Sequence, residues 1–204
     1  AIAFRTLGSH ADADDAVQEA WLRLARTGGQ DIEDLRESCH LCVLHRDRVL
    51  VLAQEESPRP FRLSVEVGSL HSPLHTTSGR VLLASMGEAA REEIMVHDLE
   101  WRREKPALRA AFVKRLAAIR ARGYERSEGE RFVGGLDIGV PVGPPDCSIK
   151  AALTIATLKE KSGPDLETML PALQACADVI AVHAGLKREE GVPSADAANR
   201  RPEV

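Results

Sequence analysis

The spacing of hydrophobic residues predicts an order of helices and strands along the chain. Apolar positions recur at helical spacing over residues 12–26, which predicts one amphipathic helix near the start. Further on the period changes to two, and residues 38–44 and 49–53 form two strands on either side of a turn at 46–47. Alternation over residues 62–68 predicts a third, half-buried strand.

The second half of the chain is predicted to hold four helices and a β-hairpin. A hydroxyl-rich loop at 69–79 leads into a short apolar helix at 81–84. Helices are then expected at 88–99, 106–122 and 165–186, and strands at 132–142 and 148–158 across a turn at 143–146. Strands that neighbour each other along the chain, separated by a helical block, indicate an α+β fold with helices on one antiparallel sheet.

The longest of these helices, 106–122, has an apolar and a basic face. Its apolar positions are expected to face the core: Leu108, Ala111, Phe112, Leu116 and Ile119. Its basic positions are expected to stay outside: Arg109, Lys114, Arg115, Arg120 and Arg122. Within the last helix, Pro171 is expected to bend the helix or to delay its start.

Composition narrows the classes of protein. The 204 residues hold 27 Lys and Arg against 31 Asp and Glu, a net charge of −4, which excludes a chain that is basic throughout and binds nucleic acid with its whole surface. Aromatic residues make up 3%, so the core must be aliphatic. No apolar run reaches the ~18 residues of a membrane span, and four cysteines are too few for a disulfide scaffold, so a cytoplasmic location is expected.

Two cysteines and two histidines cluster within seven residues: Cys39, His40, Cys42 and His45. Thiolates and imidazoles are zinc ligands. On a strand, however, successive side chains point to opposite faces, so these four cannot converge on one ion. We therefore expect buried strand residues here and no metal site.

Three consecutive hydroxyl residues, Thr76, Thr77 and Ser78, precede Gly79 and the apolar helix. The first amides of a helix lack intrahelical partners and can bind a carboxylate or phosphate. Simple N-capping is the alternative, but it uses only one of the three hydroxyls.

A second polar segment alternates glycines with acidic residues. Gly134, Gly135 and Gly139 would let a ligand or another backbone approach a strand closely, and Asp137 between apolar neighbours is predicted to point into a cavity. Just before it, Ser127 and Glu130 read more simply as a solvated loop, and Glu128 is expected to be solvent-exposed.

The chain lacks the sequence motifs of common enzymes. It contains no Gly-x-Ser-x-Gly elbow, no phosphate-binding loop, no His-Glu-x-x-His and no Gly-x-Gly-x-x-Gly. His75 near Ser78 could serve as a base beside a nucleophile, but no third residue is placed to orient it, so a hydrolase is disfavoured. A non-enzymatic protein without a cofactor is expected.

Taken in order, several short motifs resemble the effector-binding domain of the isocitrate-lyase-regulator (IclR) family of bacterial transcription regulators. The resemblance covers residues 37–186, and its motifs are Cys39-His-Leu-Cys-Val-Leu44, Ala53-Gln-Glu55, Arg62-Leu-Ser-Val-Glu-Val-Gly68, Pro73-Leu-His75, Ser78-Gly79, Leu82-Leu-Ala84, Ile119-Arg-Ala-Arg-Gly-Tyr124, Ser127, Glu130, Gly135, Val140-Pro-Val142 and Ala151-Ala-Leu-Thr-Ile155. It implies a curved antiparallel sheet flanked by helices, similar to the GAF fold, and a homodimer or tetramer.

The resemblance also implies a pocket for a small effector, often an organic or aromatic acid. Carried over by position, the ligand-binding residues are Thr76, Thr77, Ser78, Gly79, Ser127, Asp137, Thr154 and Ala156. Three features depart from the family pattern. The turn between His75 and Gly79 is one residue shorter, Asp137 replaces a small residue, and Ala156 replaces a hydroxyl residue.

The charge of Asp137 bears on which ligand is accepted. Two negative charges 5 Å apart repel by roughly 3 kcal/mol at an effective dielectric near 20. An acidic effector therefore requires Asp137 to be protonated, paired or turned away, and the alternative is a neutral or cationic ligand.

The first 30 residues differ from the family, whose members begin with a winged helix-turn-helix. Residues 4–24 resemble part of region 2 of an extracytoplasmic-function sigma factor, a helix that docks on RNA polymerase. This suggests an alternative function as an RNA-polymerase-associated module, and DNA contact is not expected from this chain alone. Residues 187–204 have no apolar periodicity and are expected to be disordered.

Overall fold

The computed structural model describes residues 36–130, 133–145, 147, 149–159 and 165–186. The expected helix at 12–26, with the sigma-factor-like stretch around it, and the tail at 187–204 lie outside the described residues. Over the part that is described, no helix is both long and apolar enough to cross a membrane.

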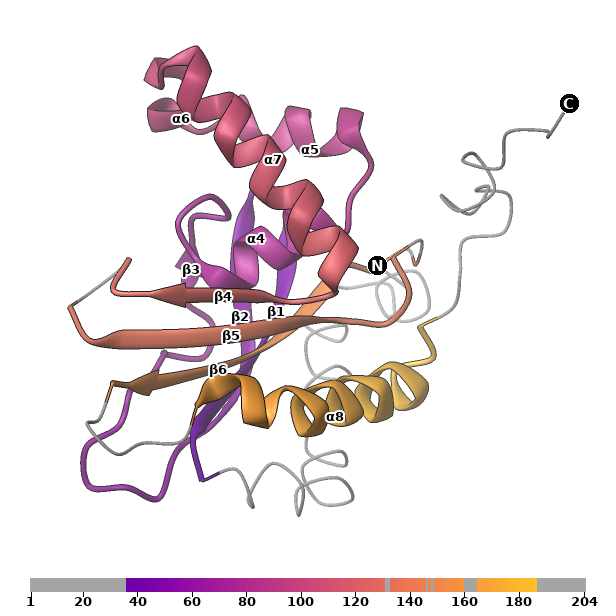
Figure 1. Ribbon diagram of the computed structural model, residues 1–204. Helices are drawn as coiled ribbons and strands as arrows, with labels where there is room; N and C mark the ends of the chain where they lie inside the picture. The colour runs from indigo at the N-terminus through magenta and orange to yellow at the C-terminus, as the bar shows by residue number, and fades with distance from the viewer. Residues whose placement is uncertain (1–35, 131–132, 146, 148, 160–164, 187–204) are drawn as a thin grey trace, which may run out of the picture.

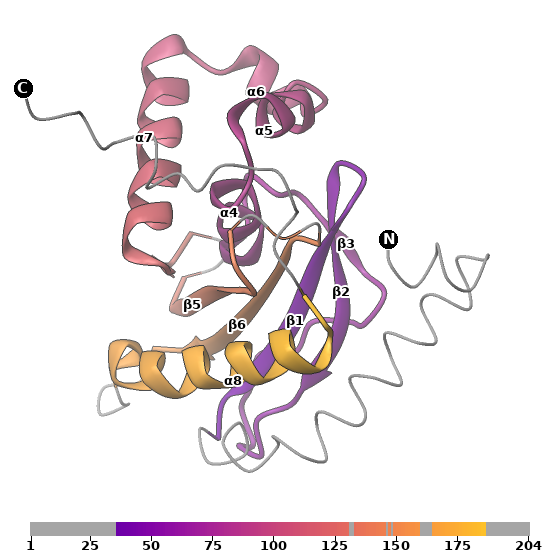
Figure 2. The same cartoon turned by 90° about the vertical axis from the view of Figure 1, so that its right-hand side faces the viewer.

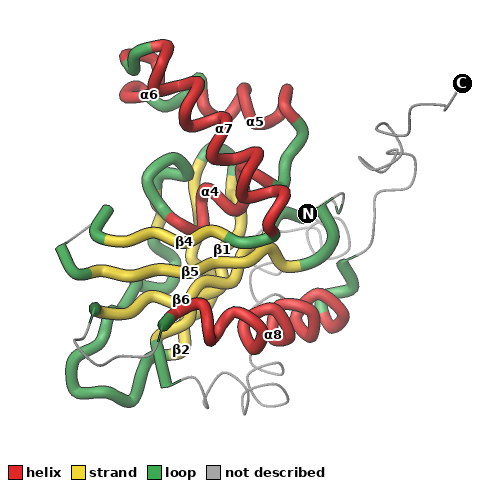
Figure 3. The backbone as a smooth tube through the Cα atoms, in the orientation of Figure 1, coloured by secondary structure: helices red, strands yellow, loops and turns green. Residues whose placement is uncertain are grey.

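Six antiparallel strands form one curved sheet, which confirms the α+β prediction (Figures 1 and 3). In chain order they are β1 (Ser38–His45), β2 (Arg48–Glu55), β3 (Leu70–His71), β4 (Glu125–Glu128), β5 (Gly135–Val142) and β6 (Ala151–Leu158). Their order across the sheet is β3-β2-β1-β6-β5-β4. The first and the last strand in chain order, β1 and β6, therefore pair with each other at the centre of the sheet.

Helices cover both faces of this sheet (Figure 2). On one side lie α4 (Thr77–Ala84), α5 (Glu88–Met95), α6 (Leu99–Arg103) and α7 (Pro106–Arg122). On the other lie a short 3-10 helix, η1 (Leu166–Met169), and α8 (Leu170–His183). Asp165 caps η1 as expected of the last helical segment, and the α-helix itself starts later, with Pro171 in its first turn.

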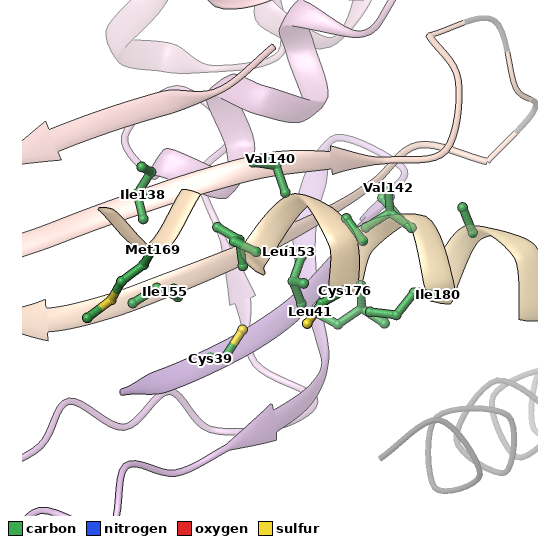
Figure 4. Packing of buried hydrophobic residues seen from close by; sticks show 14 of the residues in the cluster. Cys39, Leu41, Ile138, Val140, Val142, Leu153, Ile155, Met169, Cys176 and Ile180 are labelled. Carbon is green, nitrogen blue, oxygen red and sulfur yellow. The ribbon is translucent and has the colours of Figure 1, made fainter. Parts of the chain in front are cut away.

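The face under α8 is filled by aliphatic side chains and thiols (Figure 4). Alternate positions of the central strands point to it, among them Cys39, Leu41, Ile138, Val140, Val142, Leu153 and Ile155. From α8, Leu173, Cys176 and Ile180 close the layer, and each is 5% exposed or less. As predicted, this part of the core contains no aromatic side chain among its buried residues.

The opposite face carries the other alternate positions. Cys42, Val49, Val51 and Ala152 point from the strands toward α4, whose residues are all buried, and toward Leu116 and Ile119 of α7. Cys39 and Cys42 thus lie on opposite faces, as strand geometry predicts. Burial raises the pKa of both thiols, that of Cys42 to about 12.

The expected strand at 62–68 is wrong. The segment runs beside β2 without regular pairing, because the Gln54 side chain accepts the hydrogen bond of the Val65 amide in place of a backbone carbonyl. Backbone bonds to Val51 of β2 begin at the left-handed Gly68 and at Ser69, and Leu70–His71 then pairs with β2 as β3. The segment instead places Leu63 and Val65 along a cavity.

Two helical predictions also need correction. The helix expected at 88–99 stops at Met95, because Asp98 accepts hydrogen bonds from two amides of the next turn and starts α6. In α7, which spans the predicted residues, Leu108 is 53% exposed and only Leu116 and Ile119 are buried. Since α7 extends beyond the edge of the sheet, the first half of its apolar face has no strand beneath it (Figure 1).

Candidate functional site

A cavity of about 380 Å³ lies between the sheet and the start of α4. It is lined by residues of all six strands, of α4 and of the loops after β2, β3 and β4: His40, Cys42, Val51, Leu63, Ser64, Val65, Glu66, Ser69, His71, His75, Thr76, Thr77, Ser78, Ser127, Glu130, Asp137, Thr154 and Ala156. Its volume suits a small organic molecule. No Lys or Arg is among these lining residues.

Strand alternation brings residues from three strands to this cavity. His40 of β1 lies opposite Thr154 of β6, and Asp137 of β5 lies opposite Ala156. Each has neighbours in sequence that point to the α8 core instead, such as Cys39, Ile138 and Ile155. The cavity floor is therefore polar although the strands that form it are mostly apolar.

The start of α4 forms the cavity wall. Thr76 is its N-cap, with its hydroxyl oxygen accepting from the Gly79 amide at 3.1 Å. The Arg80 amide bonds to the Thr76 carbonyl, so among the described residues the amides of Thr77 and Ser78 are left without an acceptor. Such amides, at the positive end of a helix, can bind an anionic or hydrogen-bond-accepting group.

Gly79 itself does not line the cavity, in contrast to the expectation that it binds the ligand. A Cβ at this position would lie 2.4 Å from both Cα and O of Pro73. The glycine therefore lets the loop fold tightly over the helix start, which is a structural requirement. The other seven expected residues, Thr76, Thr77, Ser78, Ser127, Asp137, Thr154 and Ala156, all line the cavity.

Thr154 has an unusual environment. It is 1% exposed, and its hydroxyl has no hydrogen-bond partner in the part of the chain that the structure describes. Gly139, directly opposite on β5, leaves room for it, since a Cβ there would lie 2.8 Å from Thr154 Oγ1. A buried hydroxyl without a partner costs free energy, and Thr154 is one of the residues that line the cavity.

A short chain of side-chain hydrogen bonds crosses from α4 to the sheet. Thr77 Oγ1 and Ser127 Oγ are 2.7 Å apart, and the Ser127 hydroxyl donates to Asp137 Oδ2 at 3.2 Å. Ser127 is buried in β4 and pairs with Asp137 of β5. The expectation of a solvated loop around Ser127 is therefore wrong, whereas Glu128 next to it is exposed as predicted.

Behind this wall lies a group of buried charges that the sequence did not reveal. Glu125 is fully buried and accepts hydrogen bonds from Arg80 of α4 and from Arg115 and Arg122 of α7. Glu130, which lines the cavity, pairs with the same Arg80 at 2.9 Å and with Arg115 at 2.7 Å. Arg115, which was expected to stay outside, is half-buried, with 35% of its side chain exposed, and the group ties α4 and α7 to β4.

His40 contributes an uncharged ring to the cavity. Burial, together with the nearby His71, lowers the pKa of His40 to about 4, so the ring is neutral at pH 7. His75 also lines the cavity, but its Nε2 lies 2.9 Å from Oε2 of the exposed Glu100, while the Ser78 hydroxyl bonds to Cys42. The geometry does not pair His75 with Ser78 as base and nucleophile.

Comparison with protein families agrees with this architecture. The family model described as "Bacterial transcriptional regulator IclR C-terminal" matches residues 30–182. The chain belongs to this family. The IclR resemblance over 37–186 is thereby confirmed, whereas the sigma-factor-like stretch lies wholly before the matched residues and stays a prediction.

Known relatives of this IclR-type domain are transcriptional regulators. The glycerol operon regulatory protein of Streptomyces griseus is 28% identical over 171 residues, which is 81% of this chain and 63% of that protein. The chain thus spans less than two thirds of that relative's length.

Solved structures show the same fold at low sequence identity. A protein assigned as an IclR transcriptional regulator from a Silicibacter species has a TM-score of 0.73 at 23% identity, over 93% of this chain and 74% of that one. An IclR homologue from Microbacterium hydrocarbonoxydans, in complex with 4-hydroxybenzoate, has a TM-score of 0.65 at 21% identity, over 86% of this chain and 70% of that one.

Proposed function

We propose that this IclR-type domain binds a small organic effector in the cavity between the sheet and α4, and that a transcriptional regulator containing it responds to that effector. The observation that carries the proposal is Thr154, which lines the cavity and whose buried hydroxyl has no partner among the described residues. Thr77 and Ser78, whose amides have no acceptor among the described residues, line the same cavity. A ligand that reaches both would satisfy groups that are otherwise costly to bury.

The cavity is of the size of a small aromatic or aliphatic acid. Its apolar lining, Val51, Leu63 and Val65, can contact a ring or chain, while hydroxyls and amides orient the polar ends. The structural neighbour in complex with 4-hydroxybenzoate supports a ligand of this size. Self-association as a homodimer or tetramer, and DNA contact through other parts of the regulator, belong to the same proposal and rest on the family alone.

The RNA-polymerase alternative has no support of this kind. It depends on residues 12–26, which lie outside the described residues. We therefore retain the effector-binding function as the one that the cavity favours.

The test is the isosteric variant Thr154→Val. Loss of the hydroxyl should weaken binding of 4-hydroxybenzoate, or of whichever small acid, amine or sugar gives a thermal shift, by about 3- to 12-fold in calorimetry. The unliganded variant should be as stable as the wild type or more stable by up to ~1 kcal/mol, because an unpaired buried hydroxyl is replaced by a methyl group.

Thr157→Val on the same strand is the matched control. Thr157 donates to Glu37 at 2.7 Å and does not line the cavity, so this variant should lose stability by about 1 kcal/mol and keep its affinity. If Thr154→Val binds as the wild type does, or if no compound of a broad panel binds either protein, the proposed function is wrong.

A further inference from the structure

The place of Glu130 at the cavity is held by two ion pairs. Strand pairing ends with Glu128, and the chain then turns through the left-handed Gly129, so Glu130 lies beyond β4. Its Oε2 lies 2.9 Å from Arg80 of α4, and its Oε1 lies 2.7 Å from Arg115 of α7. Each carboxylate oxygen of this lining residue therefore has an arginine partner, and the two ion pairs hold the carboxylate where it lines the cavity.

Arg115 connects a helix outside the cavity to this lining residue. It does not line the cavity itself, and it also pairs with the fully buried Glu125. Arg122 of the same helix pairs with Glu125 as well, but none of its described bonds reaches Glu130. Among the described ion pairs, that between Arg115 and Glu130 is therefore the one that joins α7 to a residue lining the cavity.

We infer that Arg115 is a positioning residue of the effector site, which holds Glu130 in place and thereby raises the affinity of the cavity for its effector. The inference rests on the proposed function. Without Arg115, both carboxylates of the group share the guanidinium of Arg80. Arg80 stays with Glu125, because a fully buried charge is more costly to leave short of partners than the partly exposed Glu130. The released Glu130 carboxylate must be hydrated, and any molecule that enters the cavity has to displace this water, so binding weakens whatever the charge of the effector.

The link between the cavity and α7 also runs in the opposite direction. If Arg115 raises the affinity for a bound molecule, the bound molecule must strengthen the hold on α7 by the same free energy. The buried residues Leu116 and Ile119 lie in the second half of this helix, and the first half extends beyond the edge of the sheet (Figure 1). Occupancy of the cavity is thereby conveyed to a helix that projects from the sheet.

The experiment separates an effect on affinity from an effect on stability. Calorimetry on the full chain uses 4-hydroxybenzoate, or the first compound of a panel of small acids, amines and sugars that binds the wild type. Arg115→Gln should bind this probe about 3- to 10-fold more weakly. Arg122→Gln is the matched control, because it removes a pair with the same Glu125 from the same helix but none with Glu130. It should keep the affinity within about twofold, although the urea midpoint falls in both variants.

A double-mutant cycle shows whether Arg115 acts through Glu130. Glu130→Gln should also weaken binding, and Arg115→Gln should add nothing in the Glu130→Gln background, because no carboxylate is left there to position. Circular dichroism shows that each variant is folded. If Arg115→Gln does not fold, Arg115→Lys takes its place. Lysine is a point charge that cannot hold two carboxylates as the guanidinium does, so this variant should show the same loss of affinity to a smaller extent.

The outcomes distinguish this inference from the proposed function. If the probe binds but Arg115→Gln keeps the wild-type affinity, or if Arg122→Gln loses as much affinity, the inference is overturned and effector binding stands. The same holds if Arg115→Gln weakens binding equally in the Glu130→Gln background. If no compound of the panel binds the wild type, the proposed function is wrong and this inference falls with it.

Discussion

The two faces of the sheet are built from the same strands, yet different chemistry fills them. Under α8, side chains such as Leu153, Leu173 and Ile155 are completely buried and form a continuous apolar layer. Under α4, the layer is interrupted by a cavity of about 380 Å³, an unpaired hydroxyl and a group of buried charges. Stability can thus be supplied by one face, while the other keeps polar groups that favour a bound molecule over an empty site.

The largest effect is expected at the buried charges. Glu125→Gln removes the negative charge that faces Arg80, Arg115 and Arg122, and it should lower the free energy of unfolding by about 3–5 kcal/mol because Arg80 is left buried without full compensation. Urea unfolding measures the loss.

Glu128→Gln is the control for this variant. Glu128 is also in β4, but its pair with Lys159 is exposed, so its loss should leave the free energy of unfolding close to that of the wild type. Equal losses in the two variants would show that burial of the ions does not hold α4 and α7 to β4.

A loss of similar or somewhat smaller size is expected on the apolar face. Leu173→Ala leaves a void under α8 and should cost about 2–5 kcal/mol in urea unfolding. Ligand affinity of the folded variant should not change, because Leu173 lies on the face opposite the cavity.

Val182→Ala, at a position that is 78% exposed on the same helix, is the control and should change stability by less than about 0.5 kcal/mol. A Leu173→Ala variant that binds the effector ten times more weakly would mean that the two faces are not independent.

The third prediction concerns pH. The pKa of His40 is lowered from 6.5 to about 4 in the folded protein, so below pH 6.5 the unfolded chain takes up a proton that the folded domain does not. The contribution of the lowered His40 pKa to the free energy of unfolding is therefore complete above pH 6.5. As the pH falls toward 4 it is lost, and the free energy of unfolding decreases by about 3 kcal/mol in total. His40→Gln removes it, and unfolding of wild type and variant at several pH values gives the difference.

His45→Gln, exposed at the end of the same strand, is the matched control and should keep the wild-type dependence on pH. If wild type and His40→Gln lose stability in parallel between pH 6.5 and 4, His40 does not make the cavity face sensitive to acid.

The sequence predicted the apolar face better than the polar one. Alternating Val, Ile and Leu in β5 and β6 mark which positions meet α8, and the spacing of Leu170, Leu173 and Ile180 marks the helix that covers them. A helix after the hydroxyl residues was also predictable, because hydroxyl residues before an apolar run indicate a helix N-terminus, but α4 begins at Thr77, inside the expected loop at 69–79, and not at residue 81. Thr154 and Ala156 were assigned from the family resemblance, since nothing local distinguishes them from core residues.

The polar face depends on contacts that no local pattern shows. Glu125–Glu128 reads as a loop because all four side chains are polar, and it becomes a strand because Glu125 is neutralised by arginines up to 45 residues away in the chain. The false strand at 62–68 has the opposite origin. Its alternation is real, but Leu63 and Val65 meet a cavity, and the Gln54 side chain takes the place of a backbone partner.

The brevity of the two outermost strands has a consequence for how this protein meets other chains. At one margin β3 offers two residues, and at the other β4 offers four, with the charged Arg126 and Glu128 exposed. Edge strands that are this short and carry exposed charges are poor templates for pairing with a strand of another chain. The sheet is thereby protected against extension by another polypeptide, and runaway stacking of molecules through backbone pairing is disfavoured even when the domain is crowded.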